Sequence, residues 1–98
     1  MRFLLVASTP GKVRDIRGVT MAAVRAGHDV TIFYNEDSVE LLRNPSPVES
    51  LYAEHLACRA SMRDLGIERE QITPNGRLSS LVELVELLEK SDRVVFLG

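Results

Sequence analysis

Several residue types are scarce in this chain of 98 residues, and each scarcity excludes a class of protein. The single cysteine, Cys58, excludes an intramolecular disulfide and any zinc site built from several cysteines. There is no tryptophan and only 5% of the residues are aromatic, which leaves few rings for stacking on nucleic-acid bases. The formal net charge of −2 shows no basic excess, so we expect no nucleic-acid partner.

Long hydrophobic runs are also lacking. The apolar run near the start, Phe3–Ala7, is too short for a signal peptide or a membrane span, so we expect no membrane association. One unpaired cysteine fits a reducing compartment, and we therefore expect a cytoplasmic protein. Hydrophobic residues make up 45% of the chain, which is enough for a core, while the length suffices for one small domain and not two. The sequence thus predicts a single domain over residues 1–98.

Apolar, β-branched segments alternate with segments of helical periodicity. Arg2–Ala7 and Asp29–Tyr34 are typical of strands, and the segment 12–26 between them repeats apolar residues at helical spacing before Gly27. Strand, helix and strand within this length form a βαβ unit. We therefore predict a three-layer α/β/α fold with a mostly parallel sheet of about five strands.

The second half of the chain gives a mixed signal. Asn44–Pro47 predicts a loop, and the segment 48–57 fits either a helix or a short strand by periodicity alone. Ile72–Thr73 suggests the stub of a fourth strand before a turn at Pro74–Gly76. The cleanest amphipathic helix covers 81–90, with a capping box formed by Ser80 and Glu83, and Arg93–Gly98 predicts a final buried strand.

Polar residues follow the second predicted strand, at the edge where sites gather in open α/β sheets. The segment Asn35–Ser38 holds Asp37, which stands three places before Glu40. This spacing is that of a capping box, so we expect Asp37 to begin a short helix that runs to Leu42 or Arg43.

Cys58 is predicted to lie where a strand or loop enters a short helix that stops at Gly66. A thiol in this position faces the positive end of the helix dipole and free backbone N–H groups, which favour the thiolate. Arg59 and Arg63 add positive charge nearby, whereas Glu54 and Asp64 subtract from it. The alternative is a small packed residue, because unpaired cysteine is among the most buried residue types.

His55 stands three places before Cys58 and is a candidate general base. On a helix the two side chains would face each other, whereas on a strand they would point to opposite faces of the sheet. We favour the strand, and therefore expect His55 to lie away from the thiol.

The order of residues around Cys58 resembles the sulfur-relay segment of the DsrE/DsrF-like family, which includes the TusD-type sulfur carriers. The thiol is followed by Ser61, Arg63 and the pair Gly66–Ile67. The resemblance covers nearly the whole chain and favours a third strand at 54–57. The family tends to carry Asp-Gly-Val where this chain has Asp37, serine and valine, so the geometry of that loop is expected to differ.

The resemblance implies a small sulfur-carrier or sulfurtransferase-like protein with a persulfide on Cys58. Ser61 would bond to the sulfur or cap the helix, with Arg59, Arg63 and Asp37 in supporting roles. No cofactor and no metal are implied. The implied partners are sulfur-donor and sulfur-acceptor proteins, with a homo-oligomer or a complex of related subunits.

Two other functions remain open from the residues. The spacing of Cys58 and Ser61 is that of a single-cysteine thiol-redox motif, although the motif stands later in the chain than in thioredoxin-type folds. In the second alternative, the chain is a binding or assembly module in which the cysteine has no chemical role. Sulfur transfer needs an exposed, partly ionised thiol, so on the leading interpretation we expect Cys58 to be accessible to solvent.

Overall fold

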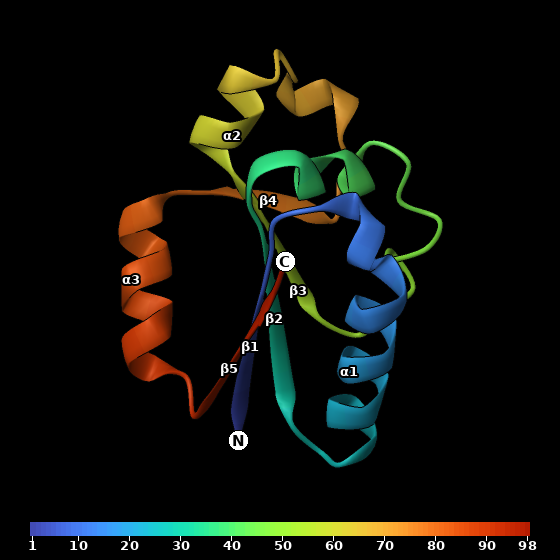
Figure 1. Ribbon diagram of the computed structural model, residues 1–98, viewed down its shortest axis with the longest axis vertical. Helices are drawn as coiled ribbons and strands as arrows, with labels where there is room; N and C mark the ends of the chain where they lie inside the picture. Colours follow the sequence, from blue (N-terminus) through green and yellow to red (C-terminus); the bar gives the residue numbers. More distant parts are fainter.

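The computed structural model describes all 98 residues. Five strands form one sheet in the order β4-β3-β2-β1-β5, and every neighbouring pair is parallel. The predicted five-stranded parallel sheet is therefore confirmed (Figure 1). The strands are β1 (Arg2–Ala7), β2 (Asp29–Tyr34), β3 (Glu54–Cys58), β4 (Gly76–Ser79) and β5 (Arg93–Leu97).

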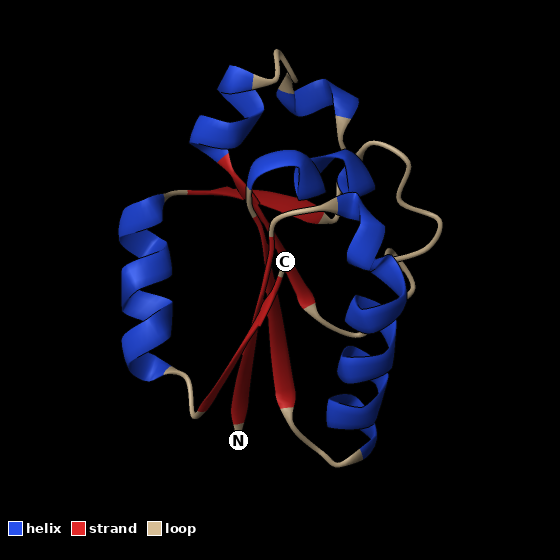
Figure 2. Ribbon diagram, in the orientation of Figure 1, coloured by secondary structure: helices blue, strands red, loops and turns tan.

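Helices cover both faces of the sheet. Helix α1 (Val13–Arg25) joins β1 to β2, the short α2 (Arg59–Asp64) follows β3, and α3 (Leu81–Lys90) joins β4 to β5. Figure 2 shows α1 and α3 on opposite sides of the strands, which gives the predicted three layers. Three short 3₁₀ helices complete the fold: η1 (Pro10–Lys12), η2 (Glu36–Leu42) and η3 (Arg69–Gln71). None of the helices is long and apolar enough to cross a lipid bilayer.

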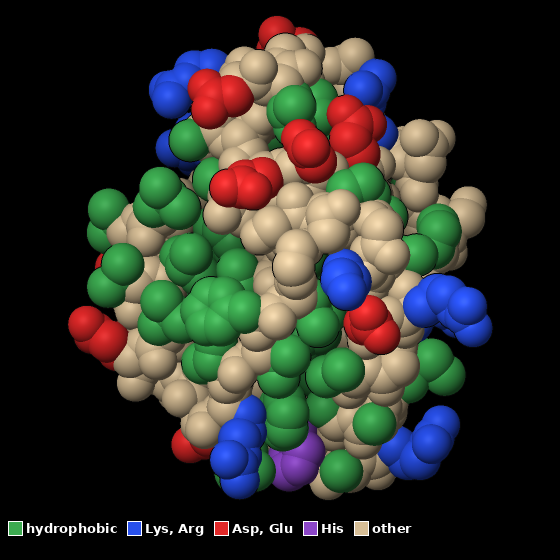
Figure 3. All heavy atoms as spheres, viewed as in Figure 1, with side chains coloured by type: hydrophobic (Ala, Val, Ile, Leu, Met, Phe, Trp, Pro, Cys, Tyr) green, Lys and Arg blue, Asp and Glu red, His purple; other side chains and the backbone are tan.

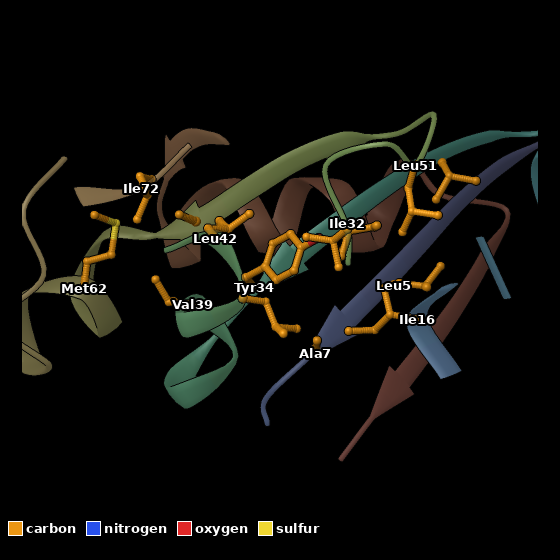
Figure 4. Packing of buried hydrophobic residues seen from close by; sticks show 14 of the residues in the cluster. Leu5, Ala7, Ile16, Ile32, Tyr34, Val39, Leu42, Leu51, Met62 and Ile72 are labelled. Atoms are coloured by element: carbon orange, nitrogen blue, oxygen red, sulfur yellow. The ribbon is translucent and has the colours of Figure 1, made fainter. Parts of the chain in front are cut away.

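The hydrophobic core is divided by the sheet into two unequal parts. Successive residues of a strand point to opposite faces, so Leu5 faces α1 while Leu4 faces α3. On the α1 side 16 buried residues pack together, and Figure 4 shows Ile16, Ile32 and Tyr34 among them. The α3 side has only five buried residues, namely Leu4, Val6, Phe33, Leu56 and Cys58. We call this second group the small cluster.

The fourth strand was wrongly placed by the sequence pattern. Ile72 and Thr73 are not part of a strand, and β4 begins at Gly76, inside the predicted turn. Ile72 is buried in the larger cluster, and the Thr73 N–H donates to the Leu42 carbonyl. These β-branched residues are buried because they pack beside Leu42 at the end of η2, not because they pair with a neighbouring strand.

Three smaller expectations also need correction. Hydrogen-bonded turns cover residues 46–50 and β3 begins at Glu54, so the ambiguous segment 48–57 is neither one helix nor one strand. The last strand, β5, is not buried, since it lies at the edge of the sheet and Phe96 is 67% exposed. Helix η2 begins at Glu36 with Asn35 as its N-cap, so Asp37 forms no capping box with Glu40.

Candidate functional site

The carboxyl ends of all five strands meet at one edge of the sheet, because the strands are parallel. At this edge Asn35 follows β2, Cys58 ends β3 and Ser79 ends β4. In open α/β sheets ligands bind outside the carboxyl ends of the strands. This edge is therefore the candidate site.

Cys58 is both the last residue of β3 and the N-cap of α2, as predicted, but its side chain is buried. It belongs to the small cluster, and the thiol-bearing residue is only 1% exposed. Ala60 and Leu84 pack against the same cluster from α2 and α3. The expectation of an accessible thiol is thus wrong for the isolated chain, because α3 covers the face of the sheet onto which Cys58 points.

Ser61 contacts the loop after β2 instead of the thiol or the start of its own helix. Its hydroxyl donates to Asn35 Oδ1 at 3.0 Å and accepts the backbone N–H of Glu36 at 2.8 Å. Helix α2 has no side-chain cap, so both roles suggested for Ser61 are wrong. Ser61 instead connects the segment after Cys58 to the carboxyl end of β2.

Glu36 adopts a backbone conformation that residues with a side chain rarely take. Its φ is +49°, and no other residue except glycine has a positive φ. Such a conformation costs of order 1 kcal/mol or more and persists only where its surroundings hold it. The bond from its N–H to Ser61 provides one such restraint. The sequence pattern singled out Asp37 in this polar segment and gave no role to Asn35 or Glu36, whose only signal was their polar character directly after a buried strand.

The remaining predicted supporting residues lie at the surface of this edge. Arg59 and Arg63 are exposed and line a groove of about 320 Å³ together with Leu78 and Glu68. No hydrogen bond links either guanidinium to Cys58, and the nearest acidic partner of Arg63 is Asp64 at 4.0 Å. Asp37 is exposed and forms no ion pair. These three charged residues thus lie at the predicted edge of the sheet, but none of them is hydrogen-bonded to the sulfur of Cys58.

A row of polar side chains lies beside Cys58 that the sequence did not indicate. Cys58 pairs in register with Ser79, and paired residues of parallel strands share a face of the sheet. The Ser79 hydroxyl donates to a carboxylate oxygen of Glu83 in α3. Arg77 donates to the Glu83 carboxylate at 2.9 Å and to Glu54 at 2.8 Å. We call Ser79, Arg77 and Glu83 the polar latch.

The polar latch keeps Glu83 ionised. Hydrogen bonds from Arg77 and, to a smaller extent, from Ser79 lower the pKa of the Glu83 carboxyl. Its hydrogen bonds to Glu83 and Glu54 raise the pKa of the Arg77 guanidinium. The predicted capping box is confirmed only for its N-cap bond, in which the Ser80 hydroxyl accepts the Glu83 N–H at 3.1 Å. The Glu83 side chain, however, turns to the latch and completes no capping box.

His55 points to the opposite face from Cys58, as expected for a strand. It lies on the α1 side and is 4% exposed. Its Nδ1 accepts the Tyr34 hydroxyl at 2.9 Å, which leaves Nε2–H to donate to the Leu51 carbonyl at 3.3 Å. Burial lowers the pKa of His55. His55 is therefore a core residue on the far side of the sheet from the thiol.

The fold is shared with solved structures of very different sequence. The YchN protein from E. coli is 13% identical, with a TM-score of 0.77 over 98% of this chain and 99% of that one. Protein MTH1491 from Methanobacterium thermoautotrophicum is 12% identical, with a TM-score of 0.78 over 97% of each chain. Protein BT1422 from Bacteroides thetaiotaomicron is 16% identical, with a TM-score of 0.74 over 98% of this chain and 94% of that one. At these identities the likeness establishes the fold alone.

Sequence comparison identifies the family. No curated protein matches the chain at a significant level. The sequence model of the DsrE/DsrF-like family, in contrast, matches residues 1–97. This match agrees with the resemblance around Cys58 and with the parallel five-stranded sheet. The chain therefore belongs to the DsrE/DsrF-like family.

Proposed function

We propose that this protein carries sulfur as a persulfide on Cys58 and passes it between partner thiols. Membership of the DsrE/DsrF-like family suggests a sulfur-relay role. The observation that carries the proposal is the position of the chain's only cysteine, at the carboxyl end of a central parallel strand. This is the edge of the sheet where α/β proteins place their reactive groups.

The proposed reaction is an exchange between a persulfide and a thiolate. The Cys58 thiolate attacks the terminal sulfur of a donor persulfide and forms a new sulfur–sulfur bond. The bond between that sulfur and the donor's own sulfur breaks, and its electron pair leaves with the donor as a thiolate. Transfer onward repeats the exchange with an acceptor thiolate, so no external oxidant or reductant is needed. A second cysteine in the same chain is likewise unnecessary.

Sulfur loading gives a direct test. After incubation with a cysteine desulfurase and cysteine, we expect the intact mass of the protein to rise by one sulfur atom. The rise should disappear on treatment with a thiol reductant, because the persulfide sulfur is then released. Cys58→Ser should show no rise, since no other thiol is present. An unchanged mass for the wild type with an active desulfurase would contradict the proposal.

A second candidate function is favoured by the burial of Cys58. A thiol that is 1% exposed fits a packed residue in an assembly module without chemistry of its own. If this candidate is correct, Cys58→Ala would leave the binding of partners unchanged, and the wild type would take up no sulfur. Glutathione-dependent reduction of a test disulfide would instead select the thiol-redox alternative. A cytoplasmic location suits all three functions, because each needs a reduced thiol or none.

We also propose that the protein forms a homo-oligomer or a complex with related subunits. Hydrophobic side chains gather over α3 and β5 in Figure 3. The exposed members are Leu81, Val82, Val85 and Phe96, whose exposed fractions are 53%, 70%, 53% and 67%. Continuous apolar surface of this kind is typical of a contact with another protein.

Val82→Asp is expected to shift the protein towards the monomer. The substitution places a charge on the most exposed of these four side chains, where contact with a partner would remove it from water. Light scattering across micromolar concentrations measures the effect. Met21→Asp is the matched control, since Met21 is 44% exposed on α1, on the opposite side of the sheet. A wild type that is monomeric at all concentrations would contradict self-association.

A further inference from the structure

We propose that α3 is a lid over Cys58 and that the polar latch holds it closed. The proposed function supplies the reason for opening, because a partner's sulfur must reach a thiol that is only 1% exposed. The lid itself is a property of the fold, and it is tested below without any sulfur donor.

Helix α3 packs on the sheet less completely than the elements on the other face. None of its ten residues is buried, and its leucines at 84, 87 and 88 are only partly buried against the small cluster. That cluster has five buried residues, compared with 16 on the α1 side. Elements with few buried apolar contacts open locally at a lower free energy than the whole protein unfolds. Helix α3 is therefore the cover of Cys58 that moves most readily.

The polar latch holds the end of α3 that lies nearest the thiol. Glu83 is the third residue of the helix, and Ser79 is both its partner and the register partner of Cys58. Arg77 donates to both oxygens of Glu83, at 3.3 and 2.9 Å. Charge-assisted bonds to two oxygens of one carboxylate are stronger than bonds between neutral groups. Release of Glu83 would thus free the first turn of α3 directly beside Cys58.

The ion pairs of Arg77 show why Glu83 is the residue that controls the opening of α3. Arg77 is shared between Glu83 and Glu54, a residue of β3 that stays on the sheet when α3 moves. In the open state Arg77 keeps its bond to Glu54, so opening breaks the bonds of Glu83 to Arg77 and Ser79 and leaves no buried charge. Ser79 lies in β4 and keeps its place in the sheet as well.

Alkylation of Cys58 by iodoacetamide under native conditions measures the opening. Glu83→Gln removes the charge from the latch at constant size. Because the ion pair with Arg77 is partly exposed to solvent, we expect alkylation to become about two to five times faster. Glu89→Gln is the matched control, since Glu89 is exposed on the same helix and makes no side-chain bond. It should alkylate at the rate of the wild type. Because Cys58 is the only cysteine, the reaction reports on this site alone.

Hydrogen exchange separates local opening from global unfolding. In Glu83→Gln the amides of α3 should exchange faster by a factor similar to that of alkylation, while those of β1 and β2 should remain as slow as in the wild type. An equal acceleration in β2 would mean that the variant merely unfolds more often, and this would overturn the lid. Unchanged alkylation in Glu83→Gln would overturn it as well.

The lid and the proposed function fail in different ways. If the wild type takes up sulfur and Glu83→Gln leaves the alkylation rate of Cys58 unchanged, the lid is refuted and the carrier function stands. Faster alkylation in Glu83→Gln without any sulfur uptake by the wild type would establish the lid and refute the carrier function.

Discussion

Phe33→Ala is expected to lower the free energy of unfolding by about 3–5 kcal/mol. Phe33 lies on β2, the middle strand of the sheet, and its side chain is fully buried. It belongs to the small cluster with Leu4, Leu56 and Cys58. Removal of the ring leaves a cavity between the sheet and α3, because the backbone of a central strand cannot move inward to fill it. Since domains of this size are stable by roughly 5–15 kcal/mol, the loss is a large part of the total.

Urea unfolding followed by circular dichroism gives the measurement. Phe96→Ala is the control, because it makes the same change on β5 at a side chain that is 67% exposed. Its cost should stay below about 1 kcal/mol. If α3 moves onto the sheet and fills the space left by the ring, the loss for Phe33→Ala will lie near the lower limit. Equal losses for the two variants would contradict the division of the core described above.

The parts of the fold with a buried apolar pattern could be predicted from the sequence. β1 is a nearly continuous apolar run and β2 is rich in β-branched and aromatic residues, because both faces of these strands are covered. Helices α1 and α3 have clear apolar periodicity, and Ser80 begins α3 as its spacing indicated. These elements, and the connections between them, were sufficient to indicate a parallel sheet.

The fourth strand could not be predicted because an edge strand needs no such pattern. β4 has the sequence Gly76-Arg77-Leu78-Ser79, and two of its side chains belong to the polar latch. The nearby Ile72 is buried in the larger cluster and gave the stronger apolar signal. Apolar patterns indicate which residues are buried, and here the buried residue, Ile72, does not belong to the strand.

The position of the candidate site could be predicted from the sequence, but the burial and the contacts of its residues could not. The place of Cys58 between β3 and α2 follows from local sequence, including the glycine that ends the helical segment. Its burial depends on α3, which begins 23 positions later in the chain (81 − 58). The bonds from Ser61 to Asn35 and Glu36 likewise join segments about 25 positions apart. Such contacts are set by the topology of the sheet, which no local pattern reports.

Acidification is expected to destabilise the protein through His55, starting near pH 6.5. In the folded protein the neutral ring fits its partners, since Nδ1 accepts from Tyr34 and Nε2–H donates to the Leu51 carbonyl. Protonation would place a second donor against the Tyr34 hydroxyl. Burial raises the pKa of Tyr34, so this hydroxyl keeps its proton. The lowered pKa of His55, which comes mainly from its own burial, reflects this preference for the neutral form.

The sign of the effect follows from proton linkage. As the pH falls below about 6.5, His55 binds a proton in the unfolded chain before it does so in the folded protein. The unfolded state then holds more protons, so the free energy of unfolding decreases by up to about 1.4 kcal/mol per pH unit. The decrease continues until the pH reaches the lowered pKa of the folded protein. Above about pH 6.5 both states are neutral and the effect is absent.

Urea unfolding between pH 7.5 and 5 measures this effect in the wild type and in His55→Asn. Asparagine retains a polar group close to Nδ1 but does not titrate, so its curve should be flatter than that of the wild type over this range. His28→Asn is the control, because His28 lies just before β2 and contacts the amino terminus instead of the core. It leaves the Tyr34–His55 bond intact, so it should not flatten the curve as His55→Asn does. Parallel curves for the wild type and His55→Asn would mean that carboxylates alone account for the acid sensitivity, and that His55 accepts a proton in the folded protein as readily as in the unfolded chain.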